Sequence, residues 1–118
     1  MNDSILTSIK KLVHIAEEDN SFDTDIIIYI NSAFMNLNQL GVGPVEGFSI
    51  TNERDQWSDF IDVYENPDEL TTVSAVKTYI YLKVKLIFDP PANSSVMKSY
   101  EHMISELEWR LNVASETK

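Results

Sequence analysis

Apolar residues recur every three to four positions along most of this chain, and this spacing is typical of helices that bury one face. The first such segment runs from Ser4 to Ala16, and Asn2, Asp3 or Ser4 is available as its N-cap. Its apolar stripe contains Ile5, Ile9, Leu12, Val13 and Ala16. We therefore expect a first helix over residues 4–16 with one buried side.

The polar residues 17–25 separate this helix from a second apolar segment, for which Asp23 or Thr24 is the N-cap and Gly41 the end. The run 26–30 is rich in β-branched residues and by itself favours a strand. Its continuation favours a helix, because one long stripe contains Ile26, Tyr29, Ile30, Ala33, Phe34, Leu37 and Leu40. Ile28 and Met35 lie on the opposite face and form a second apolar patch.

All three glycines and one of the four prolines fall within residues 41–47, which predicts a tight loop. Residues 48–50 are expected to form a short extended piece. Residues 53–69 contain seven acids against Arg54 alone, and the apolar anchors among them are Trp57, Phe60, Ile61, Val63 and Tyr64. This composition predicts a short helix followed by a loop.

A long helix is predicted from Pro67 to Phe88, with Asn66 as its N-cap and Pro67 as its first residue. One apolar stripe along it contains Val73, Val76, Ile80, Val84 and Ile87. A second stripe on the far side contains Ala75, Tyr79, Leu82 and Leu86. A helix that is apolar nearly all round must lie centrally or bridge two surfaces.

Asp89, Pro90 and Pro91 end the long helix, because proline donates no backbone hydrogen bond and disfavours helical geometry in the preceding residue. Asn93 or Ser94 then caps a last helix, whose predicted buried face contains Val96, Tyr100, Met103, Ile104, Leu107 and Leu111. Trp109 and Val113 project from its other side. The fold class predicted is all-α, a small bundle of four to five helices in one domain over residues 1–118.

Nineteen acidic against nine basic residues give a formal net charge of -10, a field that repels nucleic acid and anionic membranes. The absence of cysteine excludes disulfides, thiolate metal sites and thiol catalysis. No run approaches the roughly 18 apolar residues of a membrane-spanning helix, and residues 1–10 lack the pattern of a signal peptide. We expect a soluble protein, made inside a cell, without a membrane partner.

Motifs for catalysis or cofactor binding are not found in the sequence. His14 and His102 lack the partners of a zinc motif. The acidic residues 19–25 resemble a calcium loop only superficially, because Thr24 replaces the turn glycine and Ile30 the bidentate glutamate. We therefore predict that the protein is not an enzyme and holds neither a cofactor nor a metal.

The candidate subunit or partner interface consists of side chains that lie off the main buried stripes of the predicted helices. The apolar ones are Ile28, Met35, Leu82, Leu86, Trp109 and Val113, which either are sandwiched within the chain or face other subunits. The charged ones are Lys77, Lys83 and Lys85. Their stems either cover apolar surface of the same chain or bring the ammonium groups to the 53–69 segment of a neighbouring copy.

Three segments of the chain are distinctive as a set: VKTYIYLKVKLIFDPP at residues 76–91, GVGP at 41–44 and ELEWRLN at 106–112. Together they resemble the phage head-tail connector family, of which the HK97 connector is typical. The resemblance extends over nearly the whole chain. Each segment alone is only a helix with its terminators, so the specificity lies in the set.

The resemblance implies an all-helical adaptor that forms a homo-oligomeric ring of about twelve copies beneath the portal protein. Such a ring continues the DNA channel towards a downstream neck or tail-completion protein. The protein would then be made in the host cytoplasm from a phage or prophage gene, and DNA would only pass through. An acidic channel wall lets DNA slide because it does not bind phosphates. The alternative is a small dimeric regulatory or partner-binding helical module.

Overall fold

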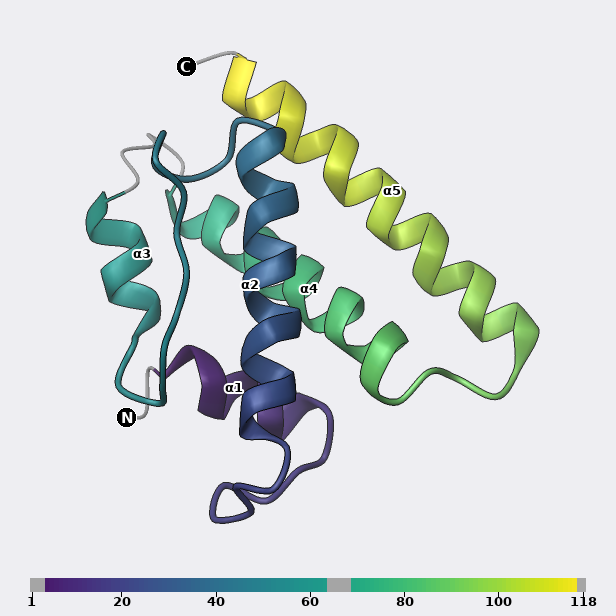
Figure 1. Ribbon diagram of the computed structural model, residues 1–118. Coiled ribbons are helices and arrows are strands. Elements are labelled where there is room, and N and C mark those ends of the chain that lie inside the picture. The colour runs from purple at the N-terminus through teal and green to yellow at the C-terminus, as the bar shows by residue number, and fades with distance from the viewer. Residues whose placement is uncertain (1–3, 64–68, 117–118) are drawn as a thin grey trace.

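The computed structural model (Figure 1) describes the backbone of residues 4–63 and 69–116 and the side chains of residues 4–61 and 73–113. Within these ranges it has five helices: α1 Ile5–Leu12, α2 Asp23–Gln39, α3 Trp57–Val63, α4 Glu69–Phe88 and α5 Ser94–Glu116. The described residues form no strand, and an isolated antiparallel bridge joins Ser4 to Gln56. The prediction of a small all-α bundle is confirmed.

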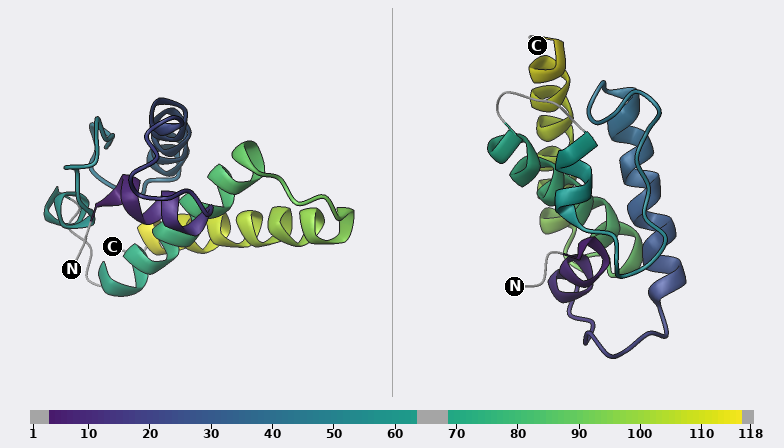
Figure 2. Two further views of the ribbon diagram at one scale, coloured as in Figure 1. Left: turned by 90° about the horizontal axis from the view of Figure 1, so that it is seen from below. Right: turned by 90° about the vertical axis from the view of Figure 1, so that its left-hand side faces the viewer.

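Helix α4 lies at the centre of the molecule and packs against each of the other four helices. Helices α2 and α5 make its most extensive contacts but lie on different sides of the molecule in both views of Figure 2. The short helices α1 and α3 complete the packing on the remaining side. The predicted central position of the long helix is therefore confirmed.

One continuous core joins all five helices. Its fully buried side chains include Ile5 and Ile9 from α1, Ile26 and Ile30 from α2, and Val76 from α4. An aromatic cluster extends this core between α2 and α3, and it contains Phe34, Phe48, Trp57 and Phe60. Since Phe48 lies in the loop and packs edge-on at 5.0 Å from Phe34, the cluster fixes the loop against α2.

Helix α1 begins as predicted, because the Ser4 hydroxyl accepts a hydrogen bond from the Thr7 N–H at 3.2 Å. Its end differs from the predicted residue 16. His14 adopts a positive φ of 65°, and the N–H groups of His14 and Ile15 return to the carbonyls of Lys11 and Lys10. This Schellman arrangement terminates the helix at Leu12. Leu12 and Ala16 are consequently exposed rather than buried.

Helix α2 ends in the same motif, with Gly41 at a φ of 84° and the Val42 N–H bonded to the Leu37 carbonyl. Its predicted N-cap is wrong. The cap position is Phe22, and no side chain there accepts a hydrogen bond from the helix. Asp23 instead forms an ion pair with Lys10 of α1, and as a first-turn acid it also favours the positive end of the helix dipole.

The loop that follows α2 is held by two asparagines of that helix. Asn31 exchanges two hydrogen bonds with the backbone of Ile50, at 2.8 Å and 3.0 Å, in the manner of a neighbouring strand. Asn38 donates to the Pro44 carbonyl at 3.0 Å. The expected extended piece at residues 48–50 is thus not paired with a strand but with one helical side chain.

The long helices differ from prediction in their exposed positions. Ile87 is exposed instead of buried on α4, and the predicted cap at Asn66 and Pro67 lies outside the described residues. On α5, the Asn93 side chain accepts from the N–H groups of Ser95 and Val96, so the predicted cap is confirmed. Val96 and Met103 are exposed rather than buried, whereas the buried side chains among the described residues of α5 are Ile104 and Leu111.

Candidate assembly surfaces

The three lysines of α4 all contact groups of their own chain. The Nζ of Lys77 lies 5.2 Å from the ring centroid of Trp57, and that of Lys83 lies 5.9 Å from the ring of Tyr79. Lys85 forms an ion pair with Asp89 at 2.7 Å. Their side chains therefore cover apolar surface or pair locally. The pairing of these lysines with the 53–69 segment of a neighbouring copy stays a prediction.

The pair of Lys85 and Asp89 closes the C-terminal end of α4. Its hydrogen bond raises the pKa of Lys85, and the same bond, helped by the ammonium charge, lowers the pKa of Asp89. Both groups are therefore charged at neutral pH, and Lys85 also places a positive charge at the negative end of the helix dipole.

The hydroxyl of buried Tyr79 joins α4 to α5. It donates a hydrogen bond to the Glu108 carboxylate of α5 at 2.7 Å. Burial and the adjacent Glu108 carboxylate raise the pKa of Tyr79, so this hydroxyl keeps its proton. The bond fixes the position of α5 along α4, which in turn decides which face of α5 reaches the surface.

Four of the apolar interface candidates lie on the surface. On α2 the exposed fractions are 54% for Ile28 and 64% for Met35, and on α5 Trp109 is 67% exposed with Val113 on the same outer side. Leu86 is half-buried against the core. The interface role of these residues stays a prediction, and their positions leave them accessible to another protein.

Leu82 does not lie on the surface. Only 2% of it is exposed, because α5 packs over the second stripe of α4 and encloses this side chain in the core. The apolar candidates were expected either to be sandwiched within the chain or to face other subunits. Leu82 is sandwiched within the chain. The residue is therefore removed from the candidate surface.

A groove of about 310 Å³ runs beside Met35, between α2 and residues 46–49. Its wall on α2 consists of Asn31, Phe34, Met35 and Asn38, and Glu46 contributes a carboxylate on the loop side. Met35 was predicted from the sequence as a candidate interface residue, but this groove was not, because the loop that forms its second wall is positioned by tertiary hydrogen bonds.

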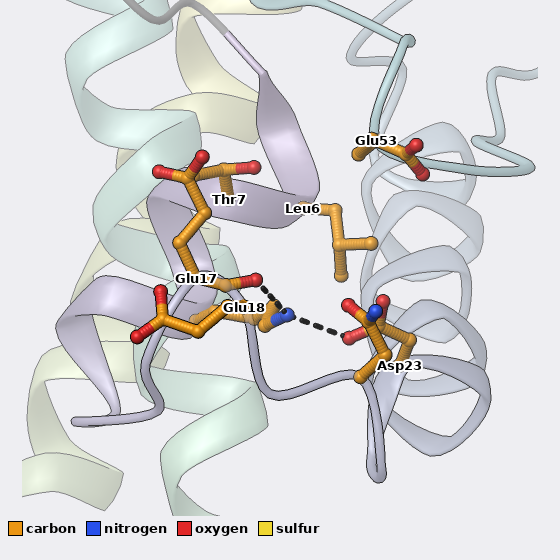
Figure 3. Close-up of a pocket in the computed structure, with 8 residues that line it drawn as sticks. Leu6, Thr7, Glu17, Glu18, Asp23 and Glu53 are labelled. Atoms are coloured by element: carbon orange, nitrogen blue, oxygen red, sulfur yellow. Dashed lines mark hydrogen bonds and ion pairs between the residues drawn. The ribbon is translucent and has the colours of Figure 1, made fainter.

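A larger, acidic cavity of about 470 Å³ lies between α1 and the start of α2 (Figure 3). Glu17, Glu18, Asp23 and Glu53 surround it. Lys10, only 3% exposed, forms the ion pair with Asp23 at 2.8 Å and donates to the Glu17 carbonyl at 3.0 Å. This site was not predicted from the sequence. The sequence indicates it only in that Lys10 follows the apolar Leu6 by four residues, which places both on the same face of a helix.

Neither metal ligation nor a membrane span is indicated by the parts of the chain that the structure describes. Those parts contain no group of three acidic, histidine or cysteine side chains placed to share a metal ion. None of their helices has both the length and the hydropathy to cross a bilayer.

Large apolar side chains exposed on two sides of a small helical bundle are typical of proteins that assemble with other proteins. The family described as phage connector protein matches residues 5–118, and the chain therefore belongs to this family. It is a connector-type structural protein and a virion component, and its partners are other virion proteins. Among curated proteins and among solved structures, nothing matches the chain.

Proposed function

We propose that this protein is the adaptor at the head-tail junction, where copies form a ring beneath the portal and continue the DNA channel towards the tail. The whole chain, residues 1–118, acts as one connector domain in this ring. Its membership of the phage connector family supports the class of function. The position in the virion, the ring and the channel are the parts that the proposal adds.

The main observation in support of a ring is that the two exposed apolar surfaces are separate. Met35 and Ile28 are exposed on α2, and Trp109 and Val113 are exposed on α5, which lies on another side of the molecule. A cyclic ring is built from head-to-tail contacts, so each copy needs two different adhesive surfaces. A two-fold dimer would need only one self-complementary surface.

The charge of the chain supports passage of DNA without binding. At a net charge of -10, the ring as a whole repels phosphates, and DNA in its channel makes few ionic contacts that would hold it. The ends of the ring then contact the portal protein on one side and a downstream neck or tail-completion protein on the other, through loops and the C-terminal segment.

Co-sedimentation with portal rings from the same genome tests the proposal. We expect saturation near one copy per portal subunit, followed by a closed ring of about twelve copies in electron micrographs of the complex. Portal rings of an unrelated phage are the control for specificity. Failure to bind the cognate portal, together with a stable dimer in solution, would instead establish the small dimeric regulatory module.

A further inference from the structure

Trp109 is the most exposed aromatic side chain among the described residues, with an exposed fraction of 67%. We infer that Trp109 and Arg110 of one copy insert into the groove beside Met35 and Glu46 of the next copy. This inference rests on the proposed ring and names its contact. The Trp109 ridge is the outer side of α5 at Trp109, Arg110 and Val113, and the Met35 groove is the groove lined by Asn31, Phe34, Met35, Asn38 and residues 46–49.

The Trp109 ridge faces away from the core of its own molecule. Ile104 and Leu111 bury the inner side of α5, and at 100° per residue Trp109 falls on the opposite side. Arg110 follows Trp109, and its guanidinium forms an exposed ion pair with Glu106 at 2.7 Å. Tryptophan and arginine together are the residues that most often contribute the binding energy of protein interfaces.

The Met35 groove is preformed. Asn31 and Asn38 use their amide groups to hold residues 44–50, and the rings of Phe34 and Phe48 supply apolar lining. Its volume of about 310 Å³ is at the lower end of the range of roughly 300–1,000 Å³ for pockets that bind compact organic groups. An indole ring is such a group.

Chemistry and charge match between the two surfaces. The Met35 thioether is flexible and makes favourable contacts with aromatic rings, so it adapts to an inserted Trp109. Glu46 is exposed at the groove, and no cation of the described residues lies within ion-pair distance of it. Copies that each carry a charge of -10 repel one another, and an arginine placed on an acid offsets part of this repulsion at the contact.

The positions of the two surfaces suit a flat ring. The Asn112 side chain donates to the Leu40 carbonyl at 3.0 Å, so the C-terminal ends of α5 and α2 lie at the same end of the molecule (Figure 1). The helices themselves lie on different sides (Figure 2). Contacts at one level on two sides repeat from copy to copy with little rise, and therefore close a ring instead of continuing as a filament.

Charge exchange between the two surfaces tests this contact on portal-bound rings. We expect Trp109→Ala, Glu46→Arg and Arg110→Glu each to weaken ring filling by on the order of tenfold or more, with the unfolding midpoint unchanged. The double variant Glu46→Arg/Arg110→Glu should recover most of the filling, because the pair is restored with reversed sign. Lys98→Glu is the matched control, since it makes the same charge change at an exposed position of α5 away from the ridge.

Cross-linking tests the same contact without the portal, because the chain contains no cysteine of its own. Chains with Glu46→Cys and chains with Arg110→Cys are mixed at high concentration and treated with a short thiol cross-linker. We expect a covalent dimer in the mixture and none with either chain alone.

The outcomes separate the two proposals. Normal filling of portal rings by Trp109→Ala and Glu46→Arg would overturn the ridge-and-groove contact and leave the adaptor function standing. Failure of the unaltered protein to bind portal would overturn the adaptor function. The head-to-tail contact would be overturned if the Glu46→Cys chain or the Arg110→Cys chain formed a cross-link by itself. It would also be overturned if the mixture of the two chains formed no cross-link.

Discussion

At the scale of single residues, the two tryptophans of this chain have opposite environments. Trp57 is buried, donates through its ring N–H to the Ser8 hydroxyl at 3.2 Å and lies beneath Lys77. Trp109 is exposed on α5. Residue type alone does not distinguish them, so the contribution of each to stability follows from burial.

We predict that Trp57→Ala lowers the free energy of unfolding by about 3–5 kcal/mol, because it leaves a cavity in the aromatic cluster. Trp109→Ala should change it by no more than about 0.5 kcal/mol, as is usual for an exposed position. Urea denaturation of the isolated protein, followed by circular dichroism, measures both. Marked unfolding of the Trp109 variant would show that this side chain belongs to the core.

Asp55 organises the turn before α3. Its carboxylate accepts hydrogen bonds from the N–H groups of Thr51 and Asn52, at 2.6 Å and 3.2 Å, and from the Thr51 hydroxyl. Burial alone would raise the pKa of Asp55, but these hydrogen bonds outweigh it and lower the pKa below its ordinary value of 3.8. The turn therefore stabilises the fold only while the carboxylate is ionised.

The lowered pKa fixes the direction of a pH effect. The stabilisation is complete above pH 3.8 and is lost as the pH falls through the pKa of the folded state. We expect Asp55→Ala to lower the free energy of unfolding by about 1–2 kcal/mol at neutral pH and by progressively less in acid. Urea denaturation at a series of pH values measures this difference. Glu101→Ala, at an exposed acid of α5, is the control. A cost independent of pH would contradict the role of the charge.

At the scale of elements, α4 and α5 are attached to the molecule very differently. Among the described side chains, six of α4 are buried, namely Val73, Val76, Tyr79, Ile80, Leu82 and Val84. Over residues 94–113 of α5, the buried side chains are Ile104 and Leu111. Since local stability follows buried apolar contact, α5 is the helix that opens more easily.

We predict that backbone amides of α5 exchange with deuterium at a lower opening free energy than those of α4. Tyr79→Phe should accelerate exchange in α5 further, because it removes the hydrogen bond to Glu108, and should leave α1 unchanged. Hydrogen exchange read out by mass spectrometry measures each helix separately. Equal protection of α4 and α5 would show that the two helices unfold as one unit.

At the scale of the whole molecule, the excess of acid dominates the electrostatics. Nineteen acids oppose nine bases, and several bases are already paired within the chain, including Lys10 with Asp23, Lys85 with Asp89 and Arg110 with Glu106. The remaining bases are outnumbered by the acids, and the field of the molecule is negative.

We therefore expect no complex with duplex DNA in a gel-retardation experiment at about 10 µM protein and about 50 mM salt, where non-specific DNA-binding proteins are retained. Low salt is the most permissive condition, since ionic contacts to phosphate weaken as salt rises. A basic DNA-binding protein is the positive control. A salt-sensitive complex with DNA would show that a basic surface outweighs the net charge.

The amino-acid sequence by itself predicted the all-α class with four to five helices, and it located several of their ends. An apolar stripe that extends over more residues than a strand identified α2. The proline pair marked the end of α4 and Asn93 the start of α5, because both signals act through local backbone chemistry. Gly41 marked the end of α2 in the same way. The end of α1 was missed because His14, and not a glycine, occupies the left-handed position.

Only the tertiary structure decided which apolar side chains reach the surface. Two stripes on α4 are visible in the sequence, but their burial depends on where α5 packs, and this enclosed Leu82 while Ile87, Val96 and Met103 stayed exposed. The Met35 groove and the acidic cavity around Lys10 likewise join residues far apart in the chain. Periodicity specifies the face of a helix, whereas the neighbour that covers this face is set by the packing of the whole core.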